Sequence, residues 1–93
     1  MTPAGKLQKY LRGRVGALGG HHRKAKWEGR VGCPDCYVWF PGGKYAWIEI
    51  KAGRDTLSPL QELEIERMDD CGLFVCIVKT EDDIDKILLK LGA

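Results

Sequence analysis

Three charged side chains in the middle of the chain could together hydrolyse a phosphodiester. Asp35 is followed by Glu49 and Lys51, two residues apart. Such hydrolysis needs carboxylate oxygens to hold a divalent metal and a cation to offset the charge that develops on the phosphate. Asp35, Glu49 and Lys51 supply that set, although an acid followed by Glu-x-Lys is a weak pattern when taken alone.

The residues around this set are expected to form two antiparallel strands. Residues 33–51 are rich in aromatic and β-branched types and are interrupted only by a Pro-Gly-Gly turn. If Phe40 pairs with Lys44 across that turn, Asp35 faces Glu49 on one side of the hairpin, next to Lys51. The other side is then apolar, with Cys36, Val38, Phe40, Ala46, Ile48 and Ile50. Two facing carboxylates repel, so a bound divalent cation is the sharpest explanation for their placement.

An aromatic block shares the face of the carboxylates in this register. It consists of Tyr37, Trp39, Tyr45 and Trp47. Burial beneath a helix is the usual fate of such a block, whereas a subunit interface and a stacking surface for unpaired bases are the functional alternatives. The sequence does not choose between them.

The length and the charge distribution favour a small globular protein with a basic end. A chain of 93 residues with 44% hydrophobic and 30% charged residues suits one domain, and no apolar run reaches the length of a membrane span, so we expect a cytoplasmic protein. All 13 acidic residues follow residue 27, whereas seven of the 15 Lys and Arg precede it. This end suits phosphate groups, or else a solvated helix face followed by a polar loop. The candidate DNA-binding residues are Lys6, Lys9, Arg12, Arg23, Lys24 and Lys26.

The four cysteines are expected to be free thiols without zinc. Cys33 and Cys36 belong to the proposed strand and would point to opposite sides of the sheet, so they could not chelate one ion together. Aromatic strand residues follow Cys36, which is not the context of a thioredoxin-like motif. Cys71 and Cys76 complete the set. Buried reduced thiols are favoured over a zinc or redox site.

The remaining elements follow from apolar spacing and capping residues. A helix is predicted from about residue 2 to 18, an irregular strand or basic loop over 21–27, a helix from Ser58 to Gly72, a buried strand over 73–78 and a last helix after Thr80. Ser58 and Gln61 form a capping box. In the second helix Leu60, Leu63 and Met68 are expected to face inward, with Glu62, Glu64 and Glu66 in solvent. The order α-β-β-β-α-β-α predicts an α/β fold with a mixed β-sheet flanked by helices.

Pro-Asp followed by Ile-Glu-Ile-Lys resembles the motif of the PD-(D/E)xK nuclease superfamily. This resemblance implies a fold with a restriction-endonuclease-like core. The string L-x-K-Y-L, A-L-G-G, K-W, G-C-P-D, P-G-G, I-E-I-K, L-S-P-L-Q and a later C-G is similar to the stand-alone, phage-type VRR-NUC domain over most of residues 1–93. The resemblance implies Asp35, Glu49 and the backbone carbonyl of Ile50 as ligands of Mg²⁺ or Mn²⁺. It implies that Lys51 acts on the attacking water or the phosphate, and that Gln61 helps to position the site.

The resemblance also implies an activity, and the sequence departs from the family pattern in its first helix. It implies a structure-selective endonuclease acting on branched DNA such as Holliday junctions, in a bacterial or phage-infected host cell. The family's first helix usually carries an acidic metal ligand, yet Ala4 or a neighbour stands there, Gln8 is the nearest polar substitute and Glu28 is the first carboxylate of the chain. A catalytically weakened metal- and DNA-binding module is therefore the alternative.

We also expect a homodimer. One such site cuts one strand, and a twofold pair presents two sites to a nearly twofold DNA junction. The pairing surface is expected to come from the aromatic block or from the first helix, with the helix and the hairpin edge preferred.

Overall fold

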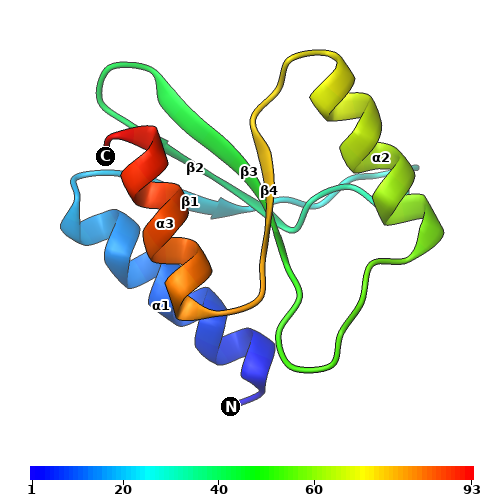
Figure 1. The fold of residues 1–93 in the computed structure, drawn as a ribbon, viewed down its shortest axis with the longest axis horizontal. Coiled ribbons are helices and arrows are strands. Elements are labelled where there is room, and N and C mark those ends of the chain that lie inside the picture. The colour runs from blue at the N-terminus through cyan, green and yellow to red at the C-terminus, as the bar shows by residue number, and fades with distance from the viewer.

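The computed structural model describes residues 1–93 and contains one four-stranded sheet and three helices (Figure 1). The strands lie in the order β1-β2-β3-β4; β1, β2 and β3 are antiparallel neighbours, and β4 is parallel to β3. This confirms the predicted mixed α/β fold and element order. None of the helices is long and apolar enough to cross a membrane. The elements are α1 (Pro3–Ala17), β1 (His21–Lys24), β2 (Cys36–Phe40), β3 (Lys44–Ile50), α2 (Pro59–Asp70), β4 (Val75–Val78) and α3 (Glu81–Leu91).

The hairpin of β2 and β3 has the predicted register. Phe40 pairs with Lys44, and the ladder continues to Cys36 opposite Ile48. Gly42 and Gly43 both have positive φ, which glycine adopts at little cost, and this allows the three-residue connection. The predicted start of the strand at Cys33 is wrong, because β2 begins at Cys36. Residues 33–35 leave the ladder, where proline at position 34 has no N–H to donate.

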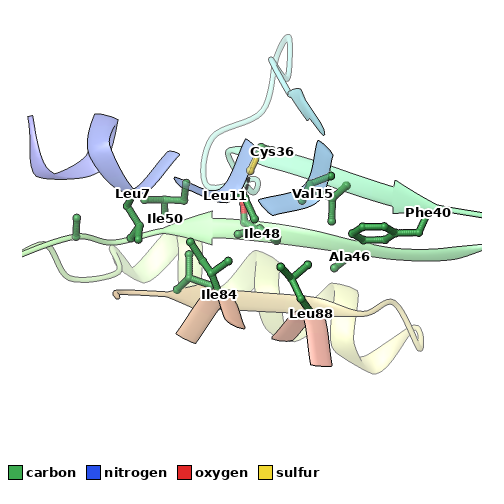
Figure 2. Close-up of a cluster of buried hydrophobic side chains, with 13 residues drawn as sticks. Leu7, Leu11, Val15, Cys36, Phe40, Ala46, Ile48, Ile50, Ile84 and Leu88 are labelled. Carbon is green, nitrogen blue, oxygen red and sulfur yellow. Dashed lines mark hydrogen bonds between the residues drawn. The ribbon is translucent and has the colours of Figure 1, made fainter. Parts of the chain in front are cut away.

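The apolar face of the sheet packs against α1 and α3 (Figure 1). Figure 2 shows side chains from both helices meeting at β3. All six residues predicted for the apolar face of the hairpin are buried in this core. A polar link joins the two helices, since Asp85 of α3 accepts hydrogen bonds from Tyr10 and Arg14 of α1. The helices contribute the buried residues Leu7, Leu11, Val15, Ile84 and Leu88.

Helix α2 begins as predicted but buries less than predicted. Ser58 and Gln61 form the reciprocal capping box. Leu60 and Leu63, expected to face inward, are 53% and 40% exposed, whereas Glu64 turns inward and accepts hydrogen bonds from neighbouring side chains. The reason is that α2 packs partly against the loop before β2, which offers polar groups and backbone in place of an apolar surface.

Strand β4 is an edge strand, which corrects the prediction of a buried run over residues 73–78. The strand starts at Val75, and Ile77 is 38% exposed, while Val78 is fully buried. A strand at the edge of a sheet has one neighbour, and the core helices cover only the face on which Val78 lies. The face that carries Ile77 is therefore less covered.

The contact between the loop and α2 predicts a specific sensitivity at Gly32. Its φ is +90°, and an added Cβ would lie 2.6 Å from the carbonyl oxygen of Leu60. We expect Gly32→Ala to lower the free energy of unfolding by about 1–3 kcal/mol, because a strained backbone and a steric clash are added together. Denaturant unfolding followed by circular dichroism measures this change.

Gly13 supplies the matched control. It lies within α1 with nothing within 4 Å of an added Cβ. Gly13→Ala is expected to raise the free energy of unfolding by about 0.5–1 kcal/mol, since alanine favours a helix interior. Equal effects of the two substitutions would contradict the packing of the loop on α2.

Candidate active site

Asp35 is brought to the candidate site by a hydrogen bond to the backbone of β3. It lies one residue before β2, outside the ladder, and its Oδ2 accepts a hydrogen bond from the Ile50 amide at 3.0 Å. Its own carbonyl accepts a hydrogen bond from the Ala25 amide. Asp35 is thus fixed from both sides at the end of β3, where the strand carries Glu49 and is followed by Lys51.

Glu49 is the one fully buried charged residue of the chain, with 1% of its surface exposed. It lies in β3 between β2 and β4, on the face opposite the buried Ile48 and Ile50. Its Oε2 lies 3.7 Å from the Nζ of Lys51, whereas its Oε1 is buried without a hydrogen-bond partner. A buried carboxylate oxygen without a partner is costly. This oxygen is therefore suited to an added cation or proton.

The pKa of Glu49 reflects the same crowding. Burial, and after it the nearby Asp35 carboxylate, raise the pKa of Glu49 from its ordinary 4.5 to about 8, and Lys51 opposes them. Two carboxyl groups that share a site disfavour each other's ionisation. The structure thus brings together the three residues that the sequence singled out, and burial beside Asp35 favours the protonated form of the Glu49 carboxyl when no cation is bound.

The residues present fit a magnesium site with few protein ligands. No group of three or more His, Cys, Asp or Glu side chains is placed to hold a metal ion. Mg²⁺ is commonly held by one or two carboxylates, with waters and substrate phosphates as the other ligands. The unpartnered Oε1 of Glu49 beside Asp35 matches such an arrangement.

A cavity of about 500 Å³ lies on the α1 side of Asp35. Gln8 lines it, and its amide contacts the ring of His22, whose pKa is lowered chiefly by burial and then by the charge of Arg12. Helix α1 brings no carboxylate to the cavity, and Glu28 is exposed in the loop before β2. The sequence did not predict the contact between Gln8 and His22. The full lining is Thr2, Ala4, Gly5, Gln8, Arg12, Lys24, Ala25, Asp35 and Ile50.

Gln61 lies at the first turn of α2, where its side chain is occupied by capping. Its Oε1 accepts a hydrogen bond from the Ser58 amide at 2.9 Å, and it does not line the cavity beside Asp35. The capping role is confirmed. A role in positioning the active site stays a prediction.

The predicted DNA-binding residues separate into distinct places. Arg12 and Lys24 line the cavity beside Asp35. Lys6 and Lys9 line a second cavity, of about 550 Å³, on another side of α1. Arg23 lies over the ring of Trp39 at 5.1 Å from its centroid. Lys26 is exposed in the loop after β1.

Three of the four rings of the aromatic block form a continuous row on the face that carries Glu49. Trp47, Tyr37 and Trp39 contact one another in sequence, with centroid distances of 4.9 and 5.3 Å. The row is extended by Trp27 against Trp47 and by His21 against Trp39. Most of these rings are half-buried, so the block is neither enclosed as a core nor free in solvent.

The four cysteines are unpaired and have separate surroundings, but the expectation of burial is wrong for Cys71, which is exposed where α2 ends. The thiol of Cys33 donates to Glu64, and the thiol of Cys36 donates to the carbonyl of Ile48 in the core. Burial raises the pKa of Cys36 and of Cys76 to about 11. These two thiols are therefore poorly prepared for nucleophilic or metal-binding chemistry.

The fold and the site have counterparts among known proteins. A model of the VRR-NUC domain family matches residues 15–82. The protein named "Putative nuclease p44" of Acyrthosiphon pisum secondary endosymbiont phage 1 is 33% identical over 76 residues, which are 82% of each chain. A solved structure described as a VRR_NUC domain has a TM-score of 0.87 at 37% identity and covers 97% of both chains. The region matched by the family model includes Asp35, Glu49 and Lys51.

The buried Glu49 predicts an unusual pH dependence of stability in chelator. Because its folded pKa is raised, its contribution to stability is fully present below about pH 4.5 and is lost as the pH rises towards 8. Glu49→Gln removes this loss. The free energy of unfolding of Glu49→Gln relative to wild type should therefore increase by more than about 1 kcal/mol between pH 5 and pH 8, since one pKa unit corresponds to about 1.4 kcal/mol.

Glu66→Gln is the control, because Glu66 is exposed on α2. The difference in free energy of unfolding between Glu66→Gln and wild type should be the same at pH 5 and at pH 8. Parallel pH profiles for wild type and Glu49→Gln would contradict the assignment of a buried, protonated carboxyl.

Proposed function

The chain belongs to the VRR-NUC domain family of nucleases, and we propose that it is a Mg²⁺-dependent endonuclease that hydrolyses phosphodiester bonds in DNA. The observation that carries this proposal is the buried Glu49 Oε1, which has no partner and lies beside Asp35. Mn²⁺ is expected to replace Mg²⁺, because both prefer oxygen ligands.

Each residue of the site has a distinct role in this proposal. Asp35, Glu49 and the backbone carbonyl of Ile50 would hold the ion, which when bound supplies positive charge beside the phosphate and makes water more acidic. Lys51 is held near the site by Glu49, so its ammonium group can stabilise the charge that develops on the phosphate. Gln61 is proposed to help position the site from the start of α2.

One specific observation favours an alternative, a catalytically weakened module that binds metal and DNA. Ala4 and Gln8 line the cavity beside Asp35, and α1 contributes no carboxylate there. A site with two carboxylates holds a divalent cation less tightly than one with three. Cleavage that requires Mn²⁺, or no cleavage with either ion, would favour this alternative.

Branched DNA such as a Holliday junction is the proposed substrate, and a homodimer is the proposed assembly. The first helix is a poor pairing surface, contrary to the expectation from the sequence, because its apolar residues Leu7, Leu11 and Val15 are buried in the protomer's own core. The face of the sheet that carries the aromatic block is the better candidate for the pairing surface. Tyr45 and Ile77 on that face are each 38% exposed, and apolar surface of this kind is typical of subunit interfaces.

Substitutions in the site should separate metal binding from catalysis. Asp35→Asn and Glu49→Gln should abolish cleavage, since each removes a charged ligand. Lys51→Ala should lower kcat by about 10²–10³ with little change in Mg²⁺ affinity, because its charge acts on the transition state. Labelled linear, flapped and four-way DNA with Mg²⁺, Mn²⁺ or chelator provides the assay.

Lys86→Ala is the control, because Lys86 pairs with Asp82 on the surface of α3. It should cleave DNA like wild type. Undiminished cleavage by Asp35→Asn would reject the assigned site, and equal losses of kcat and Mg²⁺ affinity in Lys51→Ala would make this lysine structural.

The assembly is tested by light scattering over a range of concentrations. Wild type should have about twice the 10.4 kDa mass of one chain. Tyr45→Asp should shift the protein to monomer, because it places a charge in the proposed interface. Leu89→Asp, at an exposed position on α3 away from this face, should remain dimeric. A wild-type mass near one chain, with four-way junctions bound no better than linear duplex, would remove both the dimer and the branched substrate.

A further inference from the structure

The cavity beside Asp35 gathers two cations that have no acidic partner. Arg12 projects into it from α1 and Lys24 from β1. Neither residue takes part in any of the five ion pairs of the protein. Asp35 is the only acidic residue in the lining, so the charged side chains around the cavity carry one net positive charge.

The two cations converge on the same space. Arg12 and Lys24 both lower the pKa of His22, in addition to the larger effect of its burial. Arg12 lies four residues after Gln8 on α1, so both side chains are on one face of the helix. The small residues Ala4 and Gly5 line the cavity as well and leave its interior open.

We propose that this cavity binds a backbone phosphate of the DNA strand, with Arg12 and Lys24 as the donors. A phosphate is recognised best where an arginine fork and a lysine ammonium meet, and a volume of about 500 Å³ accommodates the group with part of its sugar. This inference rests on the proposed nuclease function and deepens it. It assigns the substrate a path on the α1 side of Asp35, in addition to the contact with Lys51.

The other basic residues of α1 are less suited to this role. The cavity near Lys6 and Lys9 also contains Glu81, and the neighbouring Arg14 is paired with Asp85. The cavity near Lys6 and Lys9 also contains none of the residues assigned to the active site, so a phosphate bound there would not extend the path of the strand past Asp35. The basic end of the chain therefore contains one built phosphate site and a second group of lysines that contributes only to the general field.

The test compares two double variants with the same change of charge. Arg12→Gln with Lys24→Gln removes the proposed donors and keeps much of the aliphatic stems, and Lys6→Gln with Lys9→Gln is the matched control on the same helix. Binding of a labelled DNA duplex in chelator is measured by anisotropy between 50 and 200 mM salt. The slope of log K against log salt should fall by about one in the first variant, because one phosphate loses both of its donors, and by clearly less in the control.

Inorganic phosphate provides a second measurement that does not depend on DNA. It should raise the melting temperature of wild type and of the control, but not that of the variant at Arg12 and Lys24. Equal slopes in the two double variants, or equal stabilisation of both by phosphate, would overturn the proposal. Cleavage by wild type with Mg²⁺ judges the nuclease function separately. A cleaving wild type with equal slopes would therefore reject the phosphate site alone.

Discussion

The hydrogen bond from the Ile50 amide to the Asp35 carboxylate is the interaction on which the site depends. Asp35 precedes the ladder of β2, so strand pairing does not hold it opposite Glu49. The hydrogen bond draws its side chain to the end of β3. A hydrogen bond to a charged group contributes about 1.5–3 kcal/mol, enough to hold one side chain in place. Its consequence is the crowding of two carboxyl groups, which raises the pKa of Glu49.

The site therefore opposes the stability of the fold that contains it. Glu49 is buried on the face of β3 opposite the apolar core, and one of its carboxylate oxygens lacks a partner. Lys51 compensates only in part, at 3.7 Å from the other oxygen. Positive charge from Lys51 beside Glu49, and from Arg12 with Lys24 beside Asp35, fits an anionic substrate that crosses the end of the sheet.

The sequence predicted the fold and the central residues well where periodic patterns and turns determine them. The Pro-Gly-Gly turn set the register of the hairpin, and the alternation of apolar residues identified the buried face. Other features depend on contacts that no local pattern contains. Leu60 and Leu63 have helical spacing but remain largely exposed, and an apolar run at β4 became an edge strand because only one face was covered. The contact between Gln8 and His22 joins residues 14 apart through the packing of α1 on β1.

Asp35 and Glu49 are proposed to hold a divalent cation together. The most direct measurement is a crystal structure of the wild-type protein with Mn²⁺, in which anomalous scattering locates the ion. We predict a peak between Asp35 and the Oε1 of Glu49, the buried oxygen without a partner. A peak elsewhere, or a saturated crystal in which this oxygen contacts no metal, would contradict the account.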